Sequence, residues 1–212
     1  MSARVTIVDY GLGNLHSVIK AFRYLGANVE IATDAQGLLA APRLVVPGVG
    51  AFADGMQGLR ARGQDAALRR RAAEGCPILG ICLGAQLLLA AGEEFGRHEG
   101  LGLIAGTVRR IPDQGVKVPH VGWNRLWPPA DDAERWRGSL LAATAPGTWA
   151  YFIHSYHAVP EDPAAVLAIA RHGPHVITAA VRQQRIVGCQ FHPEKSGPAG
   201  LAMLQAFLAE PA

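Results

Sequence analysis

The chain has 212 residues, of which 50% are hydrophobic, and a formal net charge of +3. A chain of this length and composition can bury a substantial core, and we expect one domain that spans residues 1–212. Apart from Arg69–Arg71, the basic residues are scattered and carry no interleaved aromatic residues, which indicates a solvated helix face rather than a nucleic-acid-binding surface.

The first half of the chain alternates short apolar segments with segments of helical character. Residues 1–9 run directly into a strand pattern, without the charged, apolar and small-residue order of a secretory signal. No apolar run is long enough to span a membrane, so we expect a cytoplasmic protein. The predicted elements are strands over 5–9, 28–31, 44–46 and 78–81 and helices over 15–25 and 64–74, with a further helix after Cys82 that carries Gln86–Ala91. This alternation favours a parallel sheet, and ligands would collect at its carboxyl edge, in the loops 10–14, 47–50 and 82–84.

The second half of the chain is richer in short extended segments. Strands are expected over 103–111, 149–154, 166–170, 176–181 and 186–191, and a helix over 198–208 closes the chain. The three cysteines form no Cys-x-x-Cys pair, which argues against a disulfide framework or a zinc cluster and suits a reducing compartment. We expect Cys76 and Cys189 to be inert.

The segment Gly80-Ile81-Cys82-Leu83-Gly84 joins a predicted apolar strand to a predicted helix. It is the thiol counterpart of the Gly-x-Ser-x-Gly nucleophile elbow, in which a strained strand-to-helix turn exposes the nucleophile between two small residues. At the head of a helix the sulfur would also face unpaired backbone N–H groups, which favour a thiolate. The pattern predicts a reactive Cys82, and the alternative is a free cysteine buried at the end of a core strand.

A second segment, His192-Pro193-Glu194, offers a base and a carboxylate two residues apart. In an extended chain such residues project to the same side, and Pro193 biases His192 toward extended geometry. Glu194 could then hold one imidazole nitrogen while the other faces a thiol, as in a nucleophile, base and orienting group. The alternative is a solvated turn after a strand, because the sequence alone does not bring Cys82 and His192 together.

Six motifs occur in order along the chain. They are Tyr-Gly-Leu-Gly-Asn-Leu at 10–15, Pro-Gly-Val-Gly-Ala-Phe at 47–52, Gly-Ile-Cys-Leu-Gly-Ala-Gln at 80–86, Pro-His-Val-Gly-Trp-Asn at 119–124, Tyr-Phe-Ile-His-Ser-Tyr at 151–156 and His-Pro-Glu-Lys-Ser at 192–196. Together they resemble, over essentially the whole chain, the glutamine amidotransferase subunits of imidazole glycerol phosphate synthase, which are class I, triad-type amidotransferases. The resemblance implies an α/β fold with a flavodoxin-like, open, mixed but mostly parallel sheet and helices on both faces. Ala85 stands where this family leads us to expect a larger residue such as Met.

The resemblance implies that the protein hydrolyses glutamine to glutamate and ammonia. Cys82 would attack the side-chain amide, His192 would carry the proton to the leaving ammonia, and Glu194 would orient His192. The oxyanion hole would be formed by the backbone N–H groups of Leu83 and Val49. Our hypothesis is that Val49 joins the hole only after a peptide flip, triggered by a partner and its substrate.

The same resemblance assigns further residues to the substrate and to a partner. Glutamine binding would fall to Gly50, Gln86, Glu94, Ser155 and Tyr156. The partner-facing set would be Asn14, Trp123, Tyr151 and Lys195. The implied partner is a barrel-shaped cyclase subunit, which forms a heterodimer with this chain and uses the ammonia in histidine biosynthesis, and no cofactor or metal is implied. Taken singly, the polar residues could be ordinary surface positions, and Trp123 and Tyr151 could be core aromatics.

Three other functions would fit parts of the pattern. Another triad amidotransferase, serving anthranilate or aminodeoxychorismate formation, would share the amidase and differ in the ammonia acceptor. A non-catalytic flavodoxin-like module would use the glycine-rich loops at 11–14 and 48–50 to bind a phosphorylated ligand and would have an unreactive Cys82. A stand-alone cysteine hydrolase of small amides would need no partner.

Overall fold

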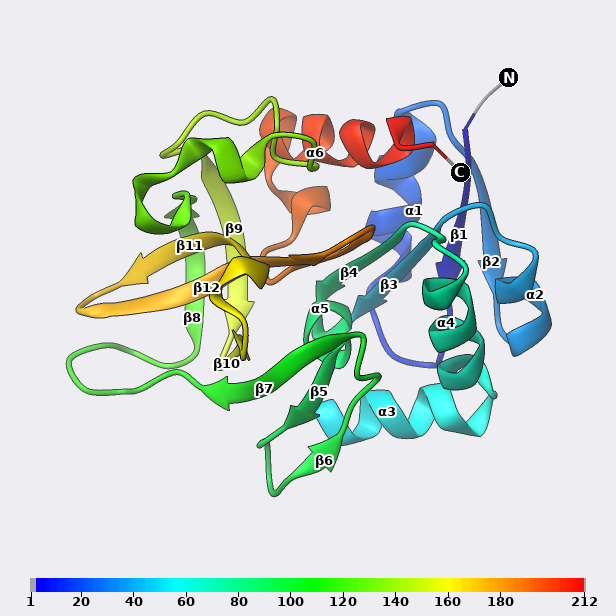
Figure 1. The fold of residues 1–212 in the computed structure, drawn as a ribbon, viewed down its shortest axis with the longest axis horizontal. Coiled ribbons are helices and arrows are strands. Elements are labelled where there is room, and N and C mark those ends of the chain that lie inside the picture. The colour runs from blue at the N-terminus through cyan, green and yellow to red at the C-terminus, as the bar shows by residue number, and fades with distance from the viewer. Residues whose placement is uncertain (1–2, 212) are drawn as a thin grey trace.

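Figure 1 shows the structure of the chain, a computed structural model that describes residues 3–211. Its centre is a seven-stranded sheet in the order β11-β12-β13-β4-β3-β1-β2. The five strands from β13 to β2 are mutually parallel, while β11 and β12 form an antiparallel hairpin at one edge. The expected mixed, mostly parallel sheet is therefore confirmed. The strands are β1 (Arg4–Val8), β2 (Asn28–Ala32), β3 (Leu44–Gly48), β4 (Ile78–Cys82), β11 (Val166–His172), β12 (His175–Gln183) and β13 (Ile186–Cys189).

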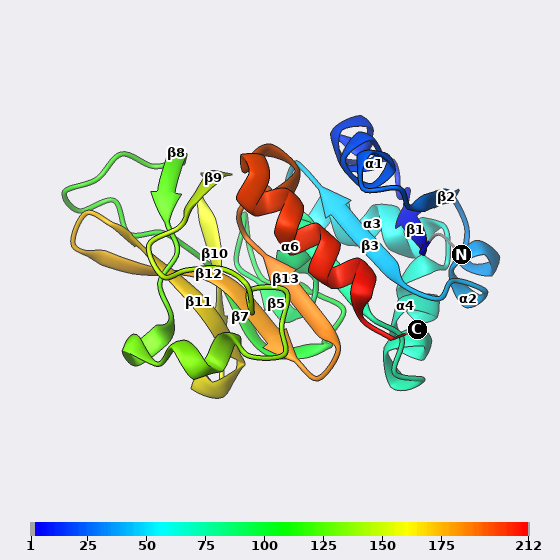
Figure 2. The same cartoon turned by 90° about the horizontal axis from the view of Figure 1, so that it is seen from above.

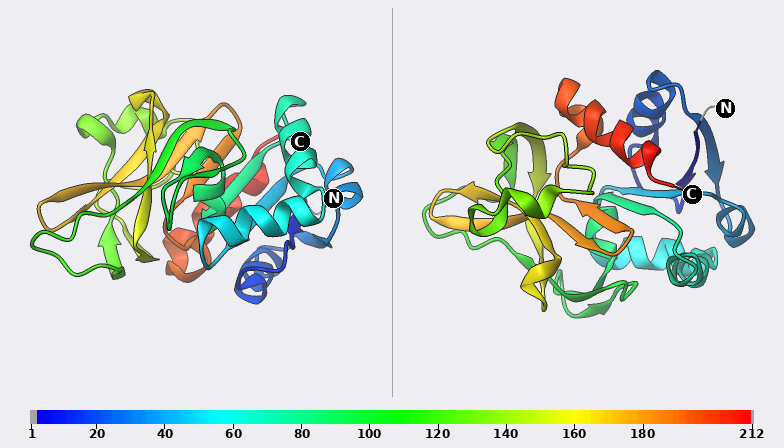
Figure 3. Two further views of the ribbon diagram at one scale, coloured as in Figure 1. Left: turned by 90° about the horizontal axis from the view of Figure 1, so that it is seen from below. Right: turned by 45° about the horizontal axis from the view of Figure 1, so that its top comes forward.

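Helices cover both faces of this sheet, as Figures 2 and 3 show from above and below. On one face α1 and α6 bury Phe22 and Phe207 in the same cluster as Val45 of β3. On the other face α3, α4 and α5 pack with Val46, the next residue of β3. Successive β3 side chains thus enter opposite cores, as the two-residue period of a strand requires. The helices are α1 (Leu15–Tyr24), α2 (Ala35–Leu39), α3 (Phe52–Ala61), α4 (Gln64–Ala73), α5 (Leu83–Leu87) and α6 (Gly197–Ala209). Among the residues described, no helix combines the length and the apolar character needed to cross a membrane.

Two smaller sheets flank the central sheet, and β10 of one lies beside β12 while β8 of the other lies beside β11 (Figure 2). One has the order β10-β7-β5-β6, and the other is the antiparallel pair β8–β9. Their strands are β5 (Leu89–Gly92), β6 (His98–Glu99), β7 (Ile104–Arg110), β8 (His120–Arg125), β9 (Trp149–His154) and β10 (Tyr156–Pro160). The turn between β9 and β10 brings residues 153–156 beside Cys82.

One predicted element is wrong. The helix that begins after Cys82 ends at Leu87, and residues 89–91, which were predicted to continue it, lie in the strand β5. The local sequence is rich in Leu and Ala, which favour a helix. However, β5 pairs with β7 on one side and with β6 on the other, and Leu89 and Ala91 are buried. This tertiary pairing overrides the local propensity.

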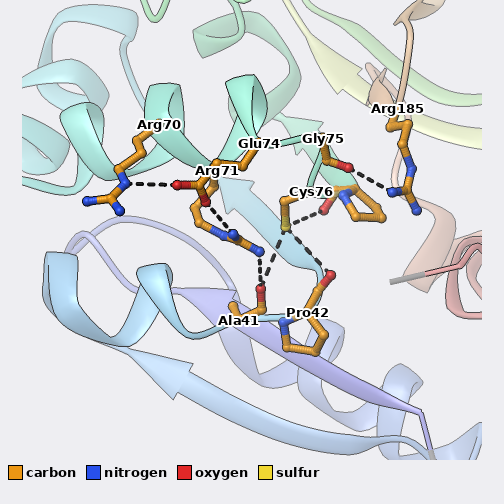
Figure 4. Close-up of polar contacts among 9 residues, drawn as sticks. Ala41, Pro42, Arg70, Arg71, Glu74, Gly75, Cys76 and Arg185 are labelled. Atoms are coloured by element: carbon orange, nitrogen blue, oxygen red, sulfur yellow. Dashed lines mark hydrogen bonds and ion pairs between the residues drawn. The ribbon is translucent and has the colours of Figure 1, made fainter.

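The opposite end of the sheet, where β3 and β4 begin, is held by arginine side chains (Figure 4). Arg71 donates to the carbonyl oxygen of Ala41 at 2.7 Å, and Arg185 donates to that of Gly75 at 2.8 Å. The buried Cys76 thiol contacts the carbonyl oxygens of Ala41 and Pro42 at 3.7 and 3.6 Å. Burial raises the pKa of Cys76 even though arginines lie nearby, so this cysteine stays a neutral thiol in a structural position.

Candidate active site

Cys82 occupies a strained turn between β4 and α5. Its φ of 55° and ψ of −112° are unfavourable for a residue with a side chain. The flanking glycines leave room for this turn. A Cβ at Gly84 would lie 1.7 Å from the Val46 carbonyl oxygen, and one at Gly80 would lie 2.7 Å from the Ala85 backbone. The turn predicted from the sequence is present, and it puts the sulfur at the carboxyl end of the central sheet.

His192 and Glu194 come to the same end of the sheet from the segment after β13. Nδ1 of His192 lies 2.7 Å from Oε1 of Glu194, and their side chains are 4% and 1% exposed. The pair is not an extended tripeptide as predicted, because residues 193–195 form a 3-10 turn that follows an extended His192. The backbone N–H of His192 donates to the Tyr151 carbonyl oxygen of β9 at 2.9 Å. The base is therefore anchored to the smaller β8–β9 sheet.

The pKa of His192 depends on both of its neighbours, Cys82 and Glu194. Burial by itself would lower the pKa of the imidazole, but its interactions with Cys82 and Glu194 outweigh burial and raise the pKa to about 9. Among the described residues, Nε2 of His192 has no hydrogen-bond partner. The interaction of the His192 imidazole with Cys82 is therefore one of proximity and charge, without a formed hydrogen bond. This leaves Nε2 free to exchange a proton with a reacting group.

A cavity of about 280 Å³ opens beside Cys82, between the ends of β3 and β4 and the β9–β10 turn. Every residue assigned above to the oxyanion hole or to glutamine binding lines it. The lining residues are Val49, Gly50, Cys82, Leu83, Gln86, Glu94, Ile153, His154, Ser155 and Tyr156. The cavity holds carbonyl, carboxylate, amide and hydroxyl groups, which suits a small polar substrate.

The segment that carries Val49 is held on both sides. Before it, the buried Tyr10 hydroxyl donates to the Pro47 carbonyl oxygen at 2.7 Å. After it, the Phe52 backbone N–H donates to Oε2 of Glu94 at 2.8 Å. Burial raises the pKa of Tyr10 far above its usual range, so the hydroxyl remains a donor. These two contacts therefore bracket residues 48–51. The hypothesis of a Val49 peptide flip stays a prediction.

Gln190 contacts the sulfur and was missed from the sequence. Its Nε2 lies 3.9 Å from the Cys82 sulfur, and its Oε1 accepts a hydrogen bond from Nε2 of Gln86 at 2.9 Å. Gln86 donates a second bond to the Tyr156 carbonyl oxygen at 3.0 Å. Gln190 is 4% exposed and is a polar residue within the apolar run 186–191. That interruption of an otherwise apolar segment is the signal that could have indicated it.

Two of the predicted partner-facing residues, Trp123 and Tyr151, form a cross-strand pair of β8 and β9. Odd-numbered residues of β8 and β9 form an outer face of three cross-strand pairs, Val121 with Ile153, Trp123 with Tyr151, and Arg125 with Trp149. We call these six residues the outer face. Trp123 is 54% exposed and packs edge-on against Tyr151. Lys195 is exposed next to Glu194, and Asn14 is exposed at the start of α1, where its side chain caps the helix.

Comparisons with known proteins agree on one family. The family model for glutamine amidotransferase class-I matches residues 6–210. The chain is 44% identical over 209 residues to the imidazole glycerol phosphate synthase subunit HisH 1 of Legionella pneumophila (strain Lens), covering 96% of this chain and 98% of that protein. It is 47% identical over 202 residues to the imidazole glycerol phosphate synthase subunit HisH of Symbiobacterium thermophilum, covering 95% and 92%. A chain in the structure of PurLQS from Thermotoga maritima superposes with a TM-score of 0.74 at 19% identity, covering 98% of both chains, and shows the same fold.

Proposed function

The chain belongs to the class-I glutamine amidotransferase family, and from that premise we propose that it is the glutaminase subunit of an imidazole glycerol phosphate synthase. It hydrolyses glutamine to glutamate and ammonia and supplies the ammonia for histidine biosynthesis. The chemistry is supported above all by one observation: the strained Cys82 meets, in one small cavity, polar groups from α5, from the segments after β3 and β5, and from the β9–β10 turn. We further propose that the whole chain, residues 1–212, acts as one cytoplasmic domain.

The reaction divides amide hydrolysis into two steps. The Cys82 thiol passes its proton to His192, and the sulfur attacks the side-chain carbonyl carbon of glutamine. The C–N bond then breaks as His192 gives that proton to the leaving nitrogen, which departs as ammonia and leaves a thioester. Neutral His192 takes a proton from water, whose oxygen attacks the thioester; the C–S bond breaks, glutamate is released, and the proton returns from His192 to the sulfur. Glu194 holds Nδ1 of His192 throughout and stabilises its charged form.

Two groups of residues would hold glutamine in the cavity. The backbone N–H of Leu83 starts α5 beside the sulfur and, with Val49, receives the developing oxyanion. Each such donor is worth roughly 3 kcal/mol of barrier. The amino-acid end of glutamine would be held by Glu94, Ser155, Tyr156 and the backbone at Gly50, which line the same cavity. The amide end lies next to Gln86.

The partner is a second subunit of the synthase, which we propose to be a barrel-fold cyclase that docks on the outer face as a heterodimer. Asn14 and Lys195 would flank this contact. Large aromatic residues are favoured anchors of protein interfaces, and the exposed Trp123 with Tyr151 supplies them on the same strand pair as Ile153, which lines the cavity. Docking there would let ammonia pass between the subunits without release to solvent.

The test is glutamate release by the purified chain with and without a candidate cyclase subunit and its ribonucleotide ligand. Cys82→Ala should abolish release while leaving the fold and the complex intact, as checked by circular dichroism and copurification. Glutamate release at the parent rate by Cys82→Ala would refute the assignment of the nucleophile. Copurification with an anthranilate or aminodeoxychorismate synthase instead would refute the proposed partner.

A further inference from the structure

The inner face of β8 and β9 carries a chain of hydrogen bonds, buried at its centre, that ends at the glutamine pocket. Nδ2 of Asn124 lies 3.1 Å from Nε2 of His120, and Nδ1 of His120 lies 3.0 Å from Nε2 of His154. Nδ1 of His154 then lies 2.8 Å from the Tyr156 carbonyl oxygen. His120 and His154 are 4% and 6% exposed. Along β8, His120 and Asn124 alternate with residues of the outer face.

The direction of every bond in this chain is fixed by its two ends. The Tyr156 carbonyl can only accept, so Nδ1 of His154 carries the proton and its Nε2 accepts. Nδ1 of His120 must then donate, and its Nε2 accepts from the Asn124 amide. The other amide hydrogen of Asn124 goes to the Arg171 carbonyl oxygen at 2.8 Å. Both imidazoles are neutral in this arrangement, and burial lowers the pKa of His120 to about 4 and that of His154 to about 3.

The chain of bonds holds one wall of the catalytic cavity. Residues 153–156 make the turn from β9 to β10 and line the cavity. The Ile153 carbonyl oxygen lies 3.9 Å from the Cys82 sulfur. The Tyr156 carbonyl accepts from both His154 and Gln86. Without His120, the acceptor nitrogen of His154 would be buried without a donor, and the wall could relax only by turning that imidazole or moving the strand.

We propose that His120 and Asn124 are positioning residues for glutamine, which fix the 153–156 wall through the His154 imidazole. This inference rests on the proposed glutaminase function and adds two residues that do not touch the cavity. Because His120 and Asn124 lie on the same strand as the outer-face Val121 and Trp123, the wall that holds glutamine and the surface that receives the partner share one support.

The experiment uses two reagents on the full-length chain. The first is 6-diazo-5-oxo-L-norleucine, a diazoketone with the amino-acid end of glutamine, which must sit in the pocket before it alkylates Cys82. The second is iodoacetamide, which needs only the thiol. In His120→Leu, the diazoketone concentration for half-maximal labelling rate should rise roughly tenfold, as expected for a buried acceptor left unpaired, while iodoacetamide labelling changes less than twofold. In His120→Asn, whose amide nitrogen can replace Nδ1, both should return close to the parent values.

Two further variants complete the design. Asn124→Leu leaves Nε2 of His120 without its donor and should raise the half-maximal diazoketone concentration in the same direction, which keeps the test open if His120→Leu does not fold. His175→Leu removes an imidazole that bonds only the Gln114 carbonyl oxygen, away from the cavity, and should label like the parent.

The outcomes separate the two proposals. If the parent chain is not alkylated at Cys82 by the diazoketone, the glutaminase proposal itself fails, and this inference fails with it. If the parent is labelled and the His120 and Asn124 variants show either unchanged diazoketone labelling or a parallel fall with both reagents, the positioning role is refuted and the proposed function stands. A selective loss that His120→Asn restores is the expected result.

Discussion

Replacing Glu194 with Gln isolates the effect of one buried charge on the catalytic base. Gln keeps an acceptor oxygen within reach of Nδ1 of His192, at the position now 2.7 Å away, but removes the negative charge. The raised pKa of His192 should therefore fall. A histidine with a pKa of about 9 in the folded chain and 6.5 when unfolded stabilises the fold fully below pH 6.5. That contribution is lost as the pH rises through 9.

The magnitude follows from the same difference. A raised pKa of about 9 against an ordinary 6.5 corresponds to roughly 3 kcal/mol of stabilisation, to which both Cys82 and Glu194 contribute. Between pH 6.5 and 9.5, the parent chain should lose about 1–2 kcal/mol more of its free energy of unfolding than Glu194→Gln does. Urea unfolding under reducing conditions at the two pH values measures this. Burial, with a smaller contribution from Glu194, raises the pKa of the folded Cys189 thiol above this window, so only its ionisation in the unfolded chain contributes there, and it does so in both proteins. Identical pH dependence in the two proteins would refute the electrostatic role given to Glu194.

Three further substitutions test the packing around the site and the far end of the sheet. Gln190→Leu removes the amide beside the Cys82 sulfur and takes away one acceptor of the buried Gln86 amide. It should therefore lower the free energy of unfolding by about 1–3 kcal/mol and slow iodoacetamide labelling of Cys82. Gly84→Ala places a methyl group against the Val46 carbonyl oxygen and should lower the free energy of unfolding by more than the ~1–3 kcal/mol usual for overpacking. Gly26→Ala, whose methyl group would meet open space, should lower it by about 1–2 kcal/mol because of the positive φ of Gly26. Arg71→Met removes the hydrogen bond to the Ala41 carbonyl, which then keeps, among the described residues, only the weak Cys76 thiol contact, and should cost about 1–3 kcal/mol. Arg70→Met, which like Arg71→Met loses an ion pair with Glu74 but removes no bond to a backbone carbonyl, should stay within about 1 kcal/mol. Urea unfolding measures each pair, and equal effects within a pair would contradict the contact that distinguishes them.

The parts of the fold that the sequence predicted are those with a strong local signal. The parallel strands β1, β3 and β4 are short apolar runs, and α1 has a clear apolar face, so their places were found to within one or two residues. The strands β8 and β10 were not found, because polar residues such as His120, Asn124 and His157 interrupt their apolar character. Residues 89–91 were placed in a helix because their pairing with β7 depends on residues distant in sequence.

The site shows the same division between local and distant information. Cys82, His192 and Glu194 stand in short motifs whose spacing already points to a nucleophile and an oriented base. Gln190 directly follows β13 and His154 ends β9, and their roles depend on which side chain faces them from another strand or helix. That information is absent from any single segment. Tyr10 is similar, because its hydroxyl reaches across to the Pro47 carbonyl, 37 residues later in the chain.

The outer face also gives the free subunit an intrinsic tryptophan fluorescence signal for binding. Two of the four tryptophans, Trp123 and Trp149, lie there at 54% and 49% exposure, whereas Trp136 is buried. Indole fluorescence shifts to shorter wavelengths when a neighbouring surface displaces water from the ring. Association on this side of the molecule can therefore be titrated by intrinsic emission without any label, and Trp149→Phe would assign the change to one ring while sparing the Trp123–Tyr151 contact.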